Sequence, residues 1–174
     1  MILIETSLIS DKTLNKDSKM NEKYEIDSLD RKILTHLLND ARKPFTEIAK
    51  ELIVSGGTIH QRVDKLKRVG VIEGSSIKVN LKRLGLDVTV FLGIHLRSSK
   101  DSNEVISKLE ALTEVVEAYY TTGSYALLVK VHTNDISDFH HFLTHKLQSI
   151  NSIQATESFI SLHQPIKRSI SFQG

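Results

Sequence analysis

Residues 55–70 read SGGTIHQRVDKLKRVG, and this stretch decides how the first half of the chain folds. Its apolar residues Ile59, Val63 and Leu66 recur at the spacing of a single buried helix face. Ser55 is a favoured residue at a helix N-cap, and Gly70 is placed to end the helix in a left-handed conformation. The stretch therefore predicts an amphipathic helix that begins after Ser55 and ends at Gly70.

Two further helices are predicted upstream of this one. Apolar residues recur at helical spacing over residues 29–38, and Asp27 or Ser28 is placed to cap that helix. Pro44 interrupts the pattern, and we expect Thr46 to cap a short second helix. Two short helices joined by a tight turn, behind a longer first helix, form a helix-turn-helix pattern.

The third predicted helix presents amide and cationic side chains to solvent. The residues opposite its buried stripe are Gly57, Gln61, Asp64, Lys65 and Arg68, with His60 and Lys67 on one flank and Thr58 and Arg62 on the other. The amide and cationic side chains among them donate hydrogen bonds to base edges and phosphates. We therefore predict that this face binds DNA; the alternative is an ordinary solvated helix surface.

Charge is unevenly distributed along the 174 residues, although its sum is only +2. Residues 21–83 hold 13 Lys and Arg against 9 Asp and Glu, whereas residues 84–174 hold 7 against 9. This asymmetry indicates two modules with different partners. The lack of cysteine excludes disulfides, thiolate metal sites and cysteine nucleophiles.

The N-terminal residues 1–23 show no sustained hydrophobic period, and we expect a flexible arm there. Met20 lies just before the first patterned segment, so one hypothesis is that the natural product starts at Met20. The opening MILIETSLIS is a poor secretory signal because it has no basic leader. The longest apolar run, near residues 88–96, is too short to span a bilayer. We expect a cytoplasmic protein with no membrane partner.

The second half of the chain alternates between strand and helix patterns. A short strand or hairpin is predicted within residues 71–79, followed by a hinge near Leu84-Gly85. Beyond it the pattern predicts strands over residues 88–96, 116–120, 125–131 and 153–162, and helices over residues 105–112 and 136–147. This βαββαβ order is that of a ferredoxin-like fold, so the whole chain is of the α+β class.

A sheet of this kind has helices on one face only. We expect the other face, rich in Val, Ile, Leu and Phe, to be open and apolar. A chain of this size would bury such a face by forming a dimer.

Four segments resemble a known family: IDSLDRKIL, SGGTIHQRVDKLKRVGVI, EAYYTTGSYALLVKV and IQATESFISLHQPIKR. In this order and spacing, over residues 24–170, they resemble the Lrp/AsnC family of amino-acid-responsive transcription regulators. Within it, YYTTG and TESFISL are most similar to the asparagine-responsive members. The resemblance implies a sequence-specific DNA-binding regulator that forms dimers and assembles into octamers. It also implies an amino-acid effector bound between dimers.

The resemblance divides the chain into four parts and assigns two sites. The parts are an arm (residues 1–23), a helix-turn-helix DNA-binding domain (24–72), a strand or hinge linker (73–86) and an effector-binding and oligomerisation domain (87–174). The implied DNA-binding residues are Ser55, Gly56, Gly57, Thr58, His60, Gln61, Arg62, Lys65 and Arg68. The implied effector-binding residues are Tyr120, Thr121, Thr122, Gly123, Ser124, Tyr125, Thr156 and Ser158. Strand alternation places Gln154 on the same face as Thr156 and Ser158 and adds it to the set. Two departures from the family pattern are Gly57, where members often have proline, and Ala126, where many have an acid.

The effector is expected to be a neutral amino acid. The segment 119–128 contains no acid, and an unpaired buried charge is costly, so a cationic side chain would find no partner. Strand alternation should turn Glu157 away from Thr156 and Ser158. Asparagine is preferred among neutral amino acids on the resemblance alone.

Simpler interpretations of these residues remain open. TTGS is also an ordinary hairpin turn, and Tyr119 and Tyr120 also suit plain sheet packing. His141 and His145 have the i, i+4 spacing of a two-histidine metal face, but no third ligand is evident. We expect no catalytic residue, cofactor or metal. An enzyme, or a ligand sensor whose first half binds protein, would show no salt-dependent DNA binding, which separates the alternatives.

Overall fold

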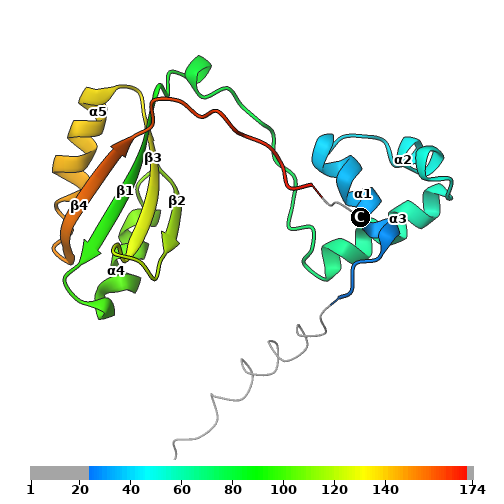
Figure 1. Ribbon diagram of the computed structural model, residues 1–174, viewed down its shortest axis with the longest axis horizontal. Coiled ribbons are helices and arrows are strands. Elements are labelled where there is room, and N and C mark those ends of the chain that lie inside the picture. Colours follow the sequence, from blue (N-terminus) through cyan, green and yellow to red (C-terminus); the bar gives the residue numbers. More distant parts are fainter. Residues whose placement is uncertain (1–23, 172–174) are drawn as a thin grey trace, which may run out of the picture. The chain divides into compact units, whose positions relative to one another are not determined.

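The computed structural model describes residues 24–171, which form two compact units (Figure 1). One unit contains the described residues up to Ile77, with the C-terminal segment from Arg168, and the other runs from Lys78 to Lys167. The predicted arm, and with it the hypothesis that the product starts at Met20, lies outside the described residues. Among the helices of residues 24–171, none is long and apolar enough to cross a membrane.

The first unit consists of three helices: α1 (Ser28–Asn39), α2 (Phe45–Leu52) and α3 (Gly56–Arg68). Each helix buries most of its predicted apolar stripe, although Leu38 at the end of α1 is exposed. Ile33 of α1, Ile48 of α2 and Ile59 of α3 are fully buried in one common core. The predicted helix-turn-helix is therefore confirmed.

The ends of these helices follow their sequence signals with one exception. Asp27 caps α1 by accepting a hydrogen bond from the Asp30 N–H (2.8 Å), and Ser55 caps α3 by accepting one from the Thr58 N–H (3.1 Å). Gly70 follows α3 with φ 76°, a conformation that glycine adopts without steric cost. The prediction that Thr46 caps α2 was wrong. Helix α2 begins at Phe45, because the carbonyl of Pro44 already accepts hydrogen bonds from Glu47 and Ile48.

The turn between α2 and α3 contains a strained residue. Ile53 has φ 55° and ψ 48°, and it is the one non-glycine residue with positive φ in the described part of the chain. A left-handed conformation costs an L-residue about 1–2 kcal/mol, and β-branching makes it less favourable still. The Val54 N–H donates to the Ala49 carbonyl at 3.0 Å and holds the tight turn in spite of this cost.

The second unit is a four-stranded antiparallel sheet with two helices on one face (Figure 1). In chain order its elements are β1 (Val88–Leu96), α4 (Ser102–Glu110), β2 (Val115–Tyr120), β3 (Leu127–Thr133), α5 (Ile136–His141), which continues as the π-helix η3 (Phe142–Leu147), and β4 (Ile153–Ile160). The strand order β2-β3-β1-β4 is that of the predicted ferredoxin-like fold, which is confirmed.

The strand or hairpin predicted within residues 71–79 was wrong. Beyond α3 the structure has no regular element before the short 3₁₀ helix η1 (Lys82–Leu84), and Ile77 and Val79 are exposed. The apolar alternation is present, but a strand also needs a neighbour for its backbone groups. Within residues 24–171 of this single chain, the segment has no such neighbour.

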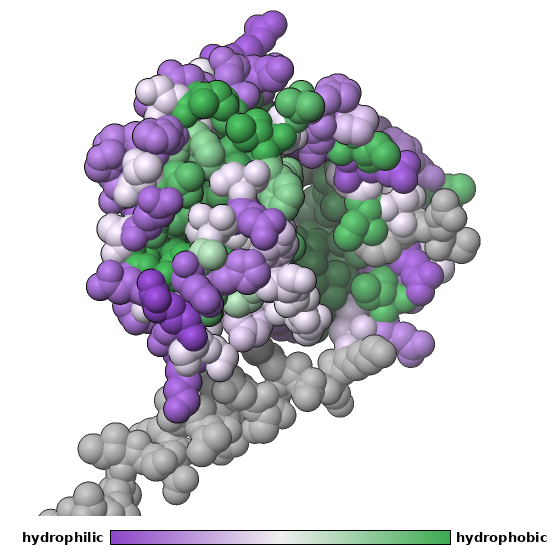
Figure 2. Space-filling view, turned by 60° about the vertical axis from the view of Figure 1, so that its left-hand side comes forward, coloured by the Kyte–Doolittle hydropathy of each residue, from purple (hydrophilic) through white to green (hydrophobic). Residues whose placement is uncertain are grey.

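Most aliphatic residues of the sheet lie on the face that the helices cover, and not on the open face. Val90, Leu92 and Ile94 of β1 are fully buried against α4, α5 and η3, in one core with Val129 and Phe142. The predicted open face of Val, Ile and Leu is therefore corrected. What we call the open face carries aromatic and charged residues with one leucine: Phe91, His95, Tyr119, Leu128, Lys130, Glu157 and Phe159. Figure 2 shows hydrophobic residues reaching the surface in patches between hydrophilic ones.

Candidate nucleic-acid interface and effector site

The predicted DNA-binding residues of α3 fall into two groups. Gly57, Gln61, Lys65 and Arg68 are exposed along one side of the helix, opposite the buried Ile59, Val63 and Leu66. We call these four residues the recognition face. In the salt bridges of residues 24–171, neither Lys65 nor Arg68 has an acidic partner. Their charges are thus available to a partner molecule.

Arg62 is not part of this available charge, although the sequence placed it there. Its guanidinium donates to the Asp27 carboxylate and lies 3.3 Å from Asp30 Oδ1. The hydrogen bond to Asp27 raises the pKa of Arg62, and the two carboxylates reinforce this shift. Arg62 therefore joins α3 to the start of α1. Its partner lies 35 residues away in the chain, and no local pattern reveals such a pair.

The Asp30 carboxylate is the centre of this contact. Its side chain is fully buried, and besides Arg62 it accepts hydrogen bonds from the Tyr24 hydroxyl (2.6 Å) and the Asp27 N–H (3.3 Å). The hydrogen bond to Asp30 is the main cause that raises the pKa of Tyr24. A buried carboxylate is tolerated only when it is paired and hydrogen-bonded in this way.

The remaining predicted residues lie at the start of α3. Ser55 is exposed, and its hydroxyl lies 2.8 Å from that of Thr58. Apart from its chain neighbours and the backbone of its own helix, no heavy atom lies within 4 Å of the position that a Cβ on Gly56 would take, so the surface at this position is open. His60 packs edge-on against the ring of Phe45, with 4.7 Å between centroids, and so contacts α2.

The predicted effector loop forms the tip of the hairpin between β2 and β3. Thr122, Gly123 and Ser124 are exposed. The Thr121 N–H donates to the Ala126 carbonyl at 3.0 Å, and the Thr121 hydroxyl donates to the Tyr125 carbonyl. The loop is thus ordered by its own hydrogen bonds and offers backbone groups and hydroxyls at its tip.

Tyr125 turns from this loop onto the open face. Its ring covers Gly93 of β1 so closely that a Cβ at Gly93 would lie 2.5 Å from the ring. Its hydroxyl donates to Glu157 at 2.8 Å, which raises the pKa of Tyr125. The ring also makes an edge contact with His95 at 5.1 Å between centroids. Glu157, which the sequence excluded from the effector site, therefore touches one of the predicted effector residues.

The predicted residues of β4 lie apart from Tyr125. Thr156 pairs with Ile94 and Ser158 with Leu92, which places both on the helix-covered face, whereas Glu157 pairs with Gly93 on the open face. The expected separation of Glu157 from Thr156 and Ser158 holds. Gln154, however, falls at an irregularity where β4 has one residue more than β1. This bulge breaks the simple alternation that grouped Gln154 with Thr156. Within this single chain, the predicted effector residues do not surround one cavity.

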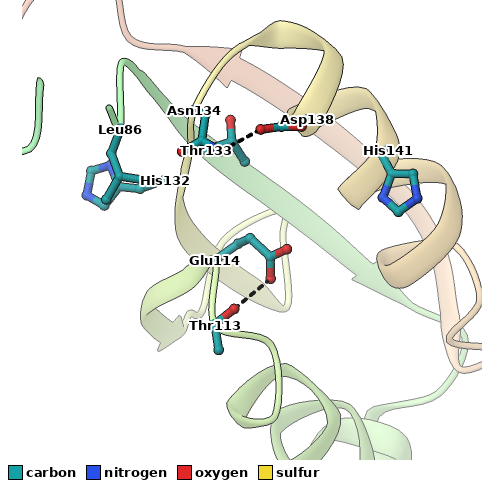
Figure 3. Close-up of a pocket in the computed structure, with 8 residues that line it drawn as sticks. All are labelled: Leu86, Thr113, Glu114, His132, Thr133, Asn134, Asp138 and His141. Atoms are coloured by element: carbon teal, nitrogen blue, oxygen red, sulfur yellow. Dashed lines mark hydrogen bonds between the residues drawn. The ribbon is translucent and has the colours of Figure 1, made fainter. Parts of the chain in front are cut away.

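A pocket of about 320 Å³ lies elsewhere in the second unit (Figure 3). Its lining residues are Leu86, Thr113, Glu114, His132, Thr133, Asn134, Asp138 and His141, none of which the sequence assigned to the DNA or effector site. Several polar groups of this pocket already have partners. Asn134 donates to Asp138 at 2.7 Å within the lining, whereas Glu114 accepts from Lys146, and His132 Nδ1 lies 3.0 Å from the Thr89 hydroxyl, both partners lying outside the lining. Burial lowers the pKa of His132.

The two histidines with metal-ligand spacing stack on each other. The rings of His141 and His145 are 4.4 Å apart and 16° from parallel, and His145 Nδ1 lies 2.8 Å from the Thr144 hydroxyl. Within residues 24–171, no three His, Asp or Glu side chains gather into a group that could hold a metal ion.

Both units match known families and proteins. The AsnC-type helix-turn-helix domain matches residues 26–67, and the Lrp/AsnC ligand binding domain matches residues 89–170. The chain is 50% identical over 147 residues to Regulatory protein AsnC of Haemophilus influenzae, which covers 84% of this chain and 98% of that protein. It is also 50% identical over 149 residues to Regulatory protein AsnC of Escherichia coli, which covers 86% of this chain and 98% of that protein.

The fold comparison agrees with the sequence comparison. The solved structure of E. coli AsnC superposes with a TM-score of 0.82 at 49% sequence identity, over 85% of this chain and 99% of that one. The helix-turn-helix unit and the ferredoxin-like unit described above are thus the DNA-binding and ligand-binding domains that the two family models name. The chain belongs to the Lrp/AsnC family of DNA-binding transcriptional regulators.

Proposed function

We propose that this regulator reads DNA through the recognition face of α3, with Gln61, Lys65 and Arg68 as the contacting side chains. The observation that carries the proposal is that these three are exposed together, whereas Arg62 is held by Asp27 and Asp30. Amide and guanidinium groups hydrogen-bond to the edges of adenine and guanine, and lysine suits phosphate. Arg62, which the sequence assigned to DNA, is left out of the proposed contact set.

The start of α3 is proposed to contact a phosphate of the DNA backbone. The first N–H groups of a helix attract phosphate, and the bare surface at Gly56 allows close approach. Ser55, Gly57 and Thr58 complete this turn, and the two hydroxyls supply further donors. These residues fix the position of the helix on DNA, since phosphate contacts carry no direct sequence information.

Lys65→Ala and Arg68→Ala are expected to weaken DNA binding without unfolding the protein. Loss of a base contact costs about 1–3 kcal/mol and relaxes specificity, whereas loss of a phosphate contact weakens all sequences alike. Fluorescence anisotropy against a duplex enriched by the parent protein from a random library measures both effects. Lys32→Ala, which removes an exposed lysine from α1, is the matched control. Parental affinity in both α3 variants would show that this face does not contact DNA.

The second unit is proposed to form a homodimer through the open face and, by analogy with the family, to assemble further into an octamer. Phe91 is 45% exposed and Phe159 is 48% exposed in the single chain, beside the Glu117–Lys130 ion pair of 2.8 Å. Aromatic residues surrounded by paired charges are typical of protein interfaces. A palindromic DNA site with half-sites one helical turn or a multiple apart would then match the two-fold symmetry.

Light scattering on the parent protein at micromolar concentration is expected to give at least twice the chain mass of 19.6 kDa. Phe91→Glu is expected to lower that mass, because it places an unpaired charge in the interface while leaving the core of the unit intact. Leu38→Glu, at an exposed position of α1, is the matched control and should leave the mass unchanged. A monomeric parent protein would overturn the proposed assembly.

The effector is proposed to be a neutral amino acid bound by the loop Tyr120 to Tyr125, with asparagine ranked first. The exposed tip of the loop offers hydroxyls and backbone groups, which suit an amide side chain. Glu157, which contacts the loop, already accepts a hydrogen bond from the Tyr125 hydroxyl and points to the opposite face of β4 from Thr156 and Ser158. Tyr125 lies on the open face, whereas Thr156 and Ser158 lie on the helix-covered face, so they do not enclose a ligand within one chain. In this proposal a second copy of the chain completes the site. The ranking of asparagine rests on the similarity to Regulatory protein AsnC.

Calorimetric titration with asparagine, glutamine, leucine, methionine and lysine is expected to show binding by a neutral amino acid, with asparagine the tightest. Gly123→Val should weaken that binding by covering the backbone at the loop tip, where no atom now lies within 4 Å of the Cβ position. Gly74→Val, at a similarly open position of the first unit, is the control. Lysine as the tightest ligand would contradict the charge argument, and a lack of binding by all five would contradict the effector site.

We propose that the protein acts by binding, not by catalysis, and that it works in the cytoplasm, where its DNA partner is. The proposed division is a DNA-binding domain over residues 24–72, a linker over 73–86 and an effector-binding and oligomerisation domain over 87–174. The similarity to transcriptional regulators over most of the chain supports this proposal. A DNA affinity that falls steeply with salt would separate this function from those of an enzyme or a protein adaptor.

A further inference from the structure

Lys65 of the recognition face has a neighbour that the sequence did not indicate. Its ammonium lies over the ring of Tyr24, 4.5 Å from the ring centroid. Tyr24 precedes α1, whereas Lys65 lies in the last turn and a half of α3, so the contact joins distant parts of the chain. At this distance the negative face of the ring attracts the ammonium.

The Tyr24 ring is itself held in place from the interior. Its hydroxyl donates to the fully buried Asp30 at 2.6 Å, and the same carboxylate contacts Arg62, three residues before Lys65 on α3. The ring is therefore fixed at its hydroxyl end while its face meets Lys65. Lys65 remains exposed and keeps its N–H donors, because an aromatic face accepts no full hydrogen bond from them.

We infer that Tyr24 is a positioning residue for DNA recognition: its ring restrains the Lys65 side chain before DNA arrives. A free lysine side chain loses rotamer freedom when it binds a phosphate, and that loss weakens binding. A lysine already restrained by a neighbouring ring loses less. This inference rests on the proposed function, in which Lys65 contacts DNA.

Tyr24→Leu and Tyr24→Phe separate the contribution of the Tyr24 ring to DNA affinity from that of its hydroxyl. Both variants lose the hydrogen bond to Asp30, but only Tyr24→Leu loses the aromatic face. The cost of ordering one rotamer-rich side chain on binding corresponds to a change of about two- to ten-fold in affinity. Tyr24→Leu is expected to weaken DNA binding by that factor, whereas Tyr24→Phe should retain most of the affinity. Equal losses in the two variants would overturn the inference, because the loss would then come from the Asp30 contact.

A double-mutant cycle with Lys65→Met tests whether the effect passes through Lys65. The probe is the duplex enriched by the parent protein from a random library, and thermal melting confirms that each variant is folded. If Tyr24 acts through Lys65, the double variant should bind no more weakly than Lys65→Met alone. Tyr24→Leu should also leave the salt dependence unchanged, since no charge is lost, whereas Lys65→Met should reduce it by about one phosphate contact.

The outcomes distinguish this inference from the proposed function. Additive losses from Tyr24→Leu and Lys65→Met would overturn the role of Tyr24 while leaving Lys65 as a DNA contact. Parental affinity in Lys65→Met would overturn the inference and remove Lys65 from the proposed contact set, whereas the proposed function would then be decided by Arg68→Ala.

Discussion

The helical unit is organised around one buried carboxylate, that of Asp30. Taking a charge out of water is costly, so its position is tolerated only because Tyr24, Asp27 and Arg62 all reach it. These partners come from the segment before α1 and from α3. The same contacts decide which charges on α3 are available, since Arg62 is held inward while Lys65 and Arg68 remain exposed. The surface proposed to bind DNA is thus a consequence of how one acid is buried.

The second unit is organised around the division of its sheet into two faces. One face packs Val90, Leu92 and Ile94 beneath the helices, and the other leaves Phe91 and Phe159 exposed beside charged pairs. Tyr125 connects the hairpin tip to that second face, because only a glycine at position 93 leaves room for its ring. A ligand at the tip and a partner chain on the open face would therefore both touch the same tyrosine.

The sequence predicted those features that depend on local pattern. Helical periodicity and the caps at Asp27, Ser55 and Gly70 sufficed for the three helices, and alternation sufficed for the four strands. It failed where the outcome depends on a distant partner: residues 71–79 alternate but have no strand beside them, and Arg62 finds its acids 32 and 35 residues away. Gln154 was misplaced because a bulge shifts the alternation by one residue. Thr46 was misplaced because Pro44 starts the helix earlier.

The claim that Asp30 holds α1 and α3 together is tested most directly by Asp30→Asn, with Asp27→Asn as the matched change. Both remove one carboxylate that contacts Arg62, but Asp30 is fully buried and the side chain of Asp27 is 47% exposed. The free energy of unfolding is measured by urea denaturation, with amide hydrogen exchange in α1 and α3 as the probe. Asp30→Asn should lower it by about 2–4 kcal/mol. Asp27→Asn, which keeps a good N-cap, should lower it by less than about 1 kcal/mol. Equal small losses in the two variants would contradict the account.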